Sequence, residues 1–218
     1  MRKKINRSIL MLSLIIAPFI YAIYLYPNLP NTIPTHFNLY GEADQWGSKE
    51  SIFLLPIILG GVSLFVYLLI SNINIVNPKQ FIHNDQLLFK NLALYIVVFM
   101  TCLTLVITYG TVHKDLSITQ LILGLLALGF IGLGIYMPKL KQNYFAGFRL
   151  PWTLENEDNW NYTHKIAGKY WVIGGVMQTI AAVVLKGKML FIIFMSTMAV
   201  MVIVPIVYSF LFFKNGKK

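Results

Sequence analysis

The segment 189–213 reads MLFIIFMSTMAVMVIVPIVYSFLFF and contains no acidic, basic or histidine side chain. An uncharged apolar run of this length meets the roughly 17–25 residues that a helix needs to cross the hydrocarbon core of a bilayer. The composition agrees, because 57% of the 218 residues are hydrophobic and 12% are charged, against about 45–50% and about 25% in soluble domains. We therefore predict an integral membrane protein.

Further uncharged stretches lie upstream, because the charged residues are clustered. The six expected spans are 8–26, 52–75, 91–112, 116–137, 170–185 and 189–213. The fifth is short for a bilayer, and Lys169 and Lys186 are expected to snorkel from its ends to make up the difference. The predicted fold class is an all-α integral membrane protein with six transmembrane helices, one extracytoplasmic loop and one amphipathic cytoplasmic loop.

The distribution of Lys and Arg predicts the orientation. If the N-terminus is cytoplasmic, the basic residues left outside are Lys49, Lys114, Lys186 and Lys188, and all the others lie inside. Because cytoplasmic loops carry the excess of basic residues, this pattern favours a cytoplasmic location for both termini. The same asymmetry accounts for the formal net charge of +10, so no direct binding of nucleic acid is expected.

The content of the spans weighs against several classes of function. They hold no Asp, Glu, Lys, Arg or His, whereas ion-coupled pumps usually need such groups at depth. A transporter of small solutes or peptides remains the alternative function. No Ser-His-Asp, HExxH or phosphate-loop pattern is present, so neither an enzyme nor a cofactor is expected. His36, Glu42 and Asp44 share one loop without a defined ligand spacing, so no metal site is expected.

Neutral polar and small residues inside the spans predict how the helices pack. Side chains such as Thr101 and Gln178 are expected to form hydrogen bonds between helices. Gly175, Thr179 and Ala182 lie on one face of the fifth expected helix. Another helix backbone is therefore expected to approach closely at that face.

The first outer loop, 27–49, reads PNLPNTIPTHFNLYGEADQWGSK. Its three closely spaced prolines favour extended or turn backbone and disfavour a helix. The aromatic side chains of Phe37, Tyr40 and Trp46 allow two interpretations. They form either a belt at the membrane interface or a small folded cap that meets a ligand arriving from outside.

The inner loop, 139–169, is longer and begins with the irregular run NYFAGFRLPW at 143–152. A helix is expected to begin near Thr153 or Asn156, which are both good N-cap residues. One stripe of this helix is apolar and aromatic, with the spacing Trp160, His164, Ala167 and Trp171. We expect the helix to lie along the inner membrane surface and to run into the fifth span. Arg149 is suited either to anchoring a lipid phosphate or to recognising a partner.

The sequence of both loops resembles a known family. Residues 144–154 read YFAGFRLPWTL and are followed by Trp160, Thr163, His164 and Gly168, a pattern that resembles the signature of the SdpI family of bacterial membrane immunity proteins. The outer loop is similar to the DUF1648 domain that commonly precedes it, through Leu29-Pro, Ile33-Pro, His36-Phe, Gly41, Asp44, Trp46 and Lys49. Where many members carry Ile-Arg-Thr-Pro-Trp, this chain has FRLPW at 148–152, a change expected to alter the partner while keeping the turn.

The resemblance implies a division into 1–77, with the DUF1648-like loop 27–50, and 78–218, with the signature loop 139–169. It also implies protection of the cell against a secreted antimicrobial peptide or protein toxin, at the bacterial cytoplasmic membrane. Toxin sensing by retention of a transcriptional repressor at the membrane is a further implication. The implied partners are therefore membrane lipid, the toxin outside and a repressor inside.

The same resemblance assigns residues to the two loops. The implied toxin-facing residues are His36, Asn38, Gly41, Asp44, Trp46 and Lys49. The implied partner-docking residues are Asn143, Gly147, Arg149, Pro151, Trp152, Thr153, Trp160 and His164.

Overall fold

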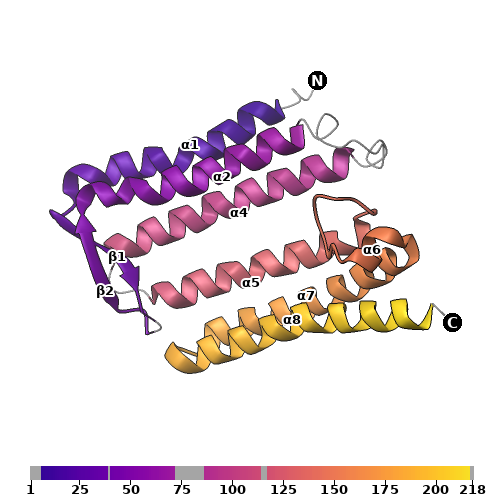
Figure 1. Ribbon diagram of the computed structural model, residues 1–218. Coiled ribbons are helices and arrows are strands. Elements are labelled where there is room, and N and C mark those ends of the chain that lie inside the picture. Colours follow the sequence, from indigo (N-terminus) through magenta and orange to yellow (C-terminus); the bar gives the residue numbers. More distant parts are fainter. Residues whose placement is uncertain (1–5, 39, 72–85, 114–116, 217–218) are drawn as a thin grey trace, which may run out of the picture. The chain divides into compact units, whose positions relative to one another are not determined.

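The computed structural model describes residues 6–38, 40–71, 86–113 and 117–216. Within this part of the chain, six helices are long and apolar enough to cross a membrane, and Figure 1 shows how these helices run. They are α1 (Arg7–Leu25), α2 (Leu54–Ser71), α4 (Gln86–Val112), α5 (Ile118–Tyr136), α7 (Glu157–Val184) and α8 (Gly187–Asn215). The prediction of six membrane-crossing helices is confirmed.

Helix α7 differs in length from the fifth span expected from the sequence. It has 28 residues, or about 42 Å at the helical rise per residue, and it exceeds the roughly 30 Å of a hydrocarbon core. The shortfall predicted for 170–185 was wrong, because the expected amphipathic helix and the span form one helix without a break. Its start was predicted correctly, since the Asn156 side chain caps it by accepting a hydrogen bond from the Asn159 N–H at 2.9 Å.

The chain folds as two compact units, each with its own core. The first comprises residues 1–72 and 90–122. Its helices pack around Met11, Ala93 and Val97. The Thr101 hydroxyl donates to the Leu14 carbonyl oxygen at 3.0 Å, which confirms the expected hydrogen bond between helices.

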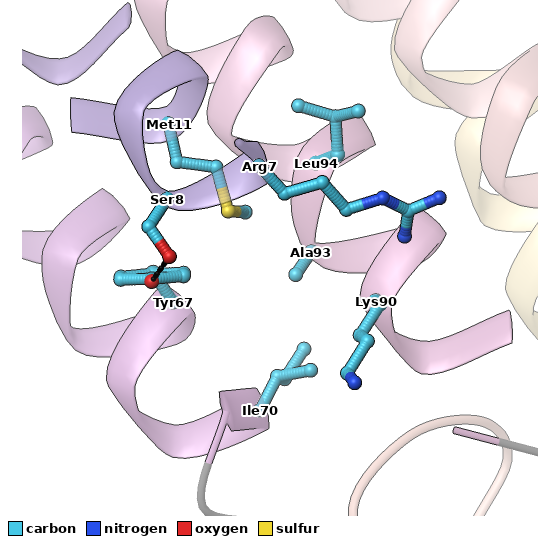
Figure 2. Close-up of a pocket in the computed structure, with 8 residues that line it drawn as sticks. All are labelled: Arg7, Ser8, Met11, Tyr67, Ile70, Lys90, Ala93 and Leu94. Atoms are coloured by element: carbon cyan, nitrogen blue, oxygen red, sulfur yellow. Dashed lines mark hydrogen bonds between the residues drawn. The ribbon is translucent and has the colours of Figure 1, made fainter. Parts of the chain in front are cut away.

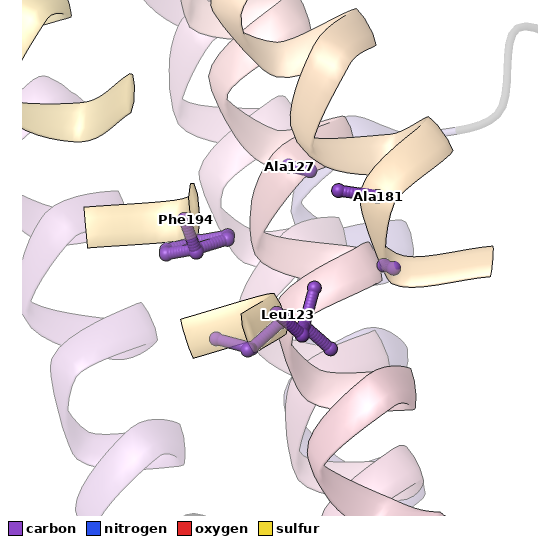
Figure 3. Close-up of a cluster of buried hydrophobic side chains, with 6 residues drawn as sticks. Leu123, Ala127, Ala181 and Phe194 are labelled. Atoms are coloured by element: carbon purple, nitrogen blue, oxygen red, sulfur yellow. The ribbon is translucent and has the colours of Figure 1, made fainter. Parts of the chain in front are cut away.

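The second unit comprises residues 73–89 and 123–218. Its core is a cluster of buried side chains from α5, α7 and α8 (Figure 3), formed by Leu123, Ala127, Ala181, Ala182, Leu190 and Phe194. Gln178 is fully buried and donates from Nε2 to the Phe194 carbonyl oxygen at 2.9 Å. The predicted close approach is also confirmed, because a Cβ at Gly175 would lie 2.9 Å from the Ala127 carbonyl oxygen of α5.

The outer loop contains a β-hairpin, so the expectation of an all-α chain was wrong there. Strands β1 (Thr32–Phe37) and β2 (Ala43–Ser48) pair antiparallel, between the short 3₁₀ helices η1 (Tyr26–Asn28) and η2 (Lys49–Phe53). The hairpin was hard to predict from the sequence, because Pro34 within β1 removes a backbone donor and normally argues against a strand. A two-stranded sheet tolerates proline because both of its strands are edges.

Candidate functional site

The hairpin is held on the ends of α1 and α2 by a small apolar cluster. Ile33 from β1 packs with Ala22 of α1 and Ile52 of η2, and all three are at most 5% exposed. Lys49 places Nζ 4.8 Å from the centre of the Tyr26 ring, and the Tyr26 hydroxyl donates to Glu50 Oε1 at 3.0 Å. These contacts give the hairpin a fixed base.

The far end of the hairpin is closed by polar side chains. His36 Nδ1 lies 2.6 Å from Asp44 Oδ1 across the two strands. Asn38 Oδ1 accepts the backbone N–H groups of Tyr40 and Glu42 at 2.9 and 3.0 Å, and Gly41 supplies the positive φ of 82° that the turn requires. The contact between His36 and Asp44 and the backbone bonds of Asn38 stabilise the turn.

The exposed part of the hairpin includes two large aromatic side chains. Trp46 is 53% exposed and Tyr40 is 63% exposed. Trp46 lies opposite Pro34 in the register of the two strands. Of the six residues predicted to face a toxin, Trp46 therefore offers the largest apolar surface, while Asn38 and Gly41 shape the turn.

The inner loop begins after η3 (Met137–Lys139) with a turn built around Asn143. The Asn143 side chain is 3% exposed, donates from Nδ2 to the Lys141 carbonyl oxygen at 2.8 Å, and accepts the N–H groups of Phe145 and Ala146 at 2.8 Å each. A buried amide that bonds to three backbone groups fixes the path of the chain. Asn143 is therefore part of the loop's interior.

His164 joins this loop to α7. Its Nε2 accepts the Phe148 backbone N–H at 3.0 Å, so Nε2 carries no proton. The proton is therefore on Nδ1, which donates to the Trp160 carbonyl oxygen at 2.8 Å. The Trp160 ring stacks on the imidazole with a centroid distance of 4.0 Å, and its Nε1 donates to the Leu140 carbonyl oxygen at 2.7 Å. The neutral imidazole is thus a cross-link between loop and helix.

The Leu150–Pro151 turn leads into the short helix α6 (Pro151–Glu155). The Thr153 hydroxyl accepts the Leu150 N–H at 2.9 Å and donates to the Phe148 carbonyl oxygen at 2.7 Å. Gln142 Nε2 donates to the carbonyl oxygens of Thr153 and Leu154 at 2.8 and 2.9 Å. Both ends of α6 are therefore held by side chains.

A polar network then ties α6 and α7 to α8. Trp152 Nε1 donates to Ser209 Oγ at 2.8 Å, and Ser209 Oγ donates to Asn159 Oδ1 at 2.8 Å. Asn159 Nδ2 donates to the Ser209 carbonyl oxygen at 3.1 Å. The Trp152 ring stacks on Phe213 at a centroid distance of 5.7 Å. The sequence analysis did not predict a role for Asn159, Ser209 or Gln142. A serine within an apolar span such as Ser209 is nevertheless a signal of hydrogen bonding between helices.

Half of the eight residues predicted to dock a partner are thus interior. Thr153, Trp160 and His164 are at most 1% exposed, and the predicted apolar stripe of α7 is covered by the loop instead of facing a membrane surface. Arg149 and Pro151 are exposed. Arg149 donates from Nη1 to the Tyr144 carbonyl oxygen at 2.8 Å, which holds the guanidinium beside the loop. The docking role stays a prediction, and Arg149 is the polar side chain in the predicted set best placed to serve it.

Two family models match the parts of the chain that contain the two loops. Residues 139–209 match the SdpI/YfhL protein family, and residues 13–60 match a domain of unknown function, DUF1648. Immunity protein SdpI of Bacillus subtilis (strain 168) is 26% identical in an alignment that covers 98% of this chain and 100% of that protein. An uncharacterized protein of Archaeoglobus fulgidus is 45% identical over 38 residues, which are 17% of this chain and 21% of that protein. No solved structure matches the chain.

The matches confirm the resemblance read from the two loops. The helices and the similarity to SdpI make the chain a multi-pass protein of the bacterial cytoplasmic membrane. The DUF1648 match contains the hairpin, and the SdpI/YfhL match contains the inner loop with α6, α7 and most of α8. The chain is thus similar to the SdpI/YfhL protein family over residues 139–209 and to the DUF1648 domain over the preceding residues 13–60.

Proposed function

We propose that this chain is an immunity protein that protects its cell from a secreted antimicrobial peptide or protein toxin. The observation that carries the proposal is the end-to-end similarity to immunity protein SdpI. The structure supplies a surface for the task, because the hairpin presents Trp46 and Tyr40 to the surroundings while a fixed base holds it. Exposed aromatic side chains on a rigid support are typical of protein-binding surfaces.

The finer proposal is a division of labour between the two loops. The basic residues favour an extracytoplasmic hairpin and a cytoplasmic inner loop. The hairpin would then meet the toxin, and the exposed face around Arg149 would hold a cytoplasmic repressor. Toxin can transmit a signal only if it binds one arrangement of the helices more tightly than another.

Cysteine labelling tests the proposed orientation. In a Cys102→Ala background, Trp46→Cys is expected to react with a membrane-impermeant maleimide in intact cells, because the hairpin lies outside. Arg149→Cys is expected to react after the membrane is permeabilised, because the inner loop lies in the cytoplasm. Labelling of position 149 in intact cells would contradict the orientation and, with it, the division of labour.

Survival in the presence of the toxin tests the function itself. Deletion of the gene is expected to sensitise the cell. The Trp46→Ala variant is expected to need about 30-fold less toxin for half-maximal killing, because an aromatic anchor contributes about 2 kcal/mol or more to an interface. The measurement is the killing curve at matched protein level in the membrane.

The control for this experiment is Phe65→Ala, because Phe65 is a similarly exposed aromatic residue (64%) on α2. It should leave protection unchanged. Equal survival of the deletion strain and the wild type would reject the immunity function. Equal survival of Trp46→Ala and Phe65→Ala would reject the hairpin as the toxin-facing surface. Pull-downs from membranes of the same strains measure how much repressor the protein retains. Arg149→Ala is the test variant and Lys165→Ala is its control.

A further inference from the structure

A cavity of about 310 Å³ lies in the first unit between the first turns of α1, the end of α2 and the first turns of α4. Its volume is at the lower end of the range for small-ligand sites. Figure 2 shows the side chains that line it, with the cavity between the three helices. Neither the hairpin nor the inner loop contributes a lining residue.

The polar side of the cavity is cationic. Arg7 of α1 and Lys90 of α4 both line it. Among residues 6–38, 40–71, 86–113 and 117–216, no carboxylate forms an ion pair with either side chain. Two cations that share one cavity repel each other. An anion bound between them is attracted to both and offsets this repulsion. The cavity therefore has the charge required to bind an anion.

Hydroxyl groups add hydrogen-bonding capacity. The Tyr67 hydroxyl donates to Ser8 Oγ at 2.8 Å, drawn as the dashed line in Figure 2. Because Ser8 Oγ accepts this bond, its own hydrogen can be donated to a ligand oxygen. Guanidinium, ammonium and hydroxyl donors around one cavity suit the several acceptor oxygens of a phosphate group.

The remaining wall is apolar. Met11 and Ala93 are 4% and 2% exposed and belong to the core of the unit, and Ile70 and Leu94 complete this wall. A free inorganic anion gains nothing from apolar contacts, whereas a lipid places its phosphate and its acyl chains against the two kinds of surface at once. The position of the cavity at the ends of membrane-crossing helices agrees with a lipid ligand.

We propose that this cavity binds the phosphate group of an anionic phospholipid, with Arg7 and Lys90 holding the phosphate and the apolar wall contacting the start of an acyl chain. The same phosphate chemistry is also offered by free phosphate in solution, which the experiment must separate from the lipid. The proposal does not depend on the immunity function. It concerns a site in the first unit, at a different place from the aromatic surface of the hairpin.

Native mass spectrometry of the purified full-length protein tests the proposal. After exchange into a mild detergent, the protein is titrated with phosphatidylglycerol, with phosphatidylcholine and with inorganic phosphate. The wild type is expected to retain phosphatidylglycerol in preference to phosphatidylcholine. The double variant Arg7→Gln/Lys90→Gln is expected to bind phosphatidylglycerol on the order of 25-fold more weakly, because each basic residue near an anionic lipid contributes about fivefold.

The matched control is Lys165→Gln/Lys169→Gln, which removes the same charge from exposed positions of α7. It should keep the wild-type affinity, as should the charge-preserving pair Arg7→Lys/Lys90→Arg. An equal loss in both Gln pairs would overturn the site, because it would reduce the effect to general surface charge. Two results together would overturn the lipid assignment in favour of free phosphate. Millimolar inorganic phosphate would displace phosphatidylglycerol, and the protein would show no preference for phosphatidylglycerol over phosphatidylcholine.

Discussion

The Gly147→Ala variant is expected to lose about 2–6 kcal/mol of stability, from backbone strain of about 1–3 kcal/mol and the loss of the partner of a part-buried backbone donor, worth about 1–3 kcal/mol. Gly147 has a φ of 111°, and an added Cβ would collide with His164 Nε2 and lie 3.0 Å from Cδ2. The imidazole would be pushed away from the Phe148 N–H that it now accepts. Thermal unfolding in detergent, followed by tryptophan fluorescence, measures the loss.

The control for this variant is Gly61→Ala. No atom lies within 4 Å of a Cβ at Gly61 in α2, so alanine there should stabilise the helix by roughly 0.5–1 kcal/mol. Opposite signs for the two glycines would support the reading of Gly147 as a structural requirement of the loop. Similar melting temperatures for both variants would show that the contact between Gly147 and His164 does not limit stability.

The buried residues of the inner loop change how the family signature is interpreted. Asn143, Thr153 and His164 each bond to backbone groups of the loop and are at most 3% exposed. Their replacement would unfold the loop and remove any docking surface indirectly. A loss of function in such variants therefore says nothing about contact with a partner. Arg149 is more informative, because it is exposed and its carbonyl contact with Tyr144 leaves further donors available.

The helices were predictable because their signal is large. An uncharged run such as 189–213 has few stable environments other than a bilayer, and α8 covers it from Gly187 to Asn215. The start of α7 was predictable for a local reason, since the Asn156 side chain satisfies a free N–H of the first turn. Both features depend on residues close together in the sequence.

Features that depend on distant residues were not predictable. The spacing of Trp160, His164 and Ala167 correctly places them on one face of a helix, but periodicity does not tell what covers that face. The structure covers it with the chain's own loop, through bonds such as that from Trp160 Nε1 to the Leu140 carbonyl oxygen. The hairpin was missed for a related reason, because its strands are anchored by Ile33 on helix ends and lack a regular alternation.

The Gly168→Val variant is expected to prevent α5 and α7 from packing, with a loss of about 3 kcal/mol or more, at the upper end of overpacking effects. A Cβ at Gly168 would lie 2.7 Å from the Gly134 carbonyl oxygen and 2.7 Å from two ring carbons of Pro138. The contact is reciprocal, since a Cβ at Gly134 would lie 2.9 Å from the Val172 backbone nitrogen. A helix backbone and a proline ring cannot move aside without displacing the whole helix. The expected readout is loss of the monodisperse peak in detergent.

The Gly174→Val variant tests whether the rigidity of the neighbouring atoms or their distance decides the cost of an added side chain. A Cβ at Gly174 would come within 2.5 Å of Met201 Sδ, which is closer than any contact at Gly168. The neighbour is nevertheless the end of a flexible thioether side chain, which can adopt another rotamer. If rigidity decides the cost, Gly174→Val should destabilise the protein less than Gly168→Val. The reverse order would mean that the closest distance decides, and that the approach of α5 to α7 at Gly134 and Gly168 is less constrained than their backbones indicate.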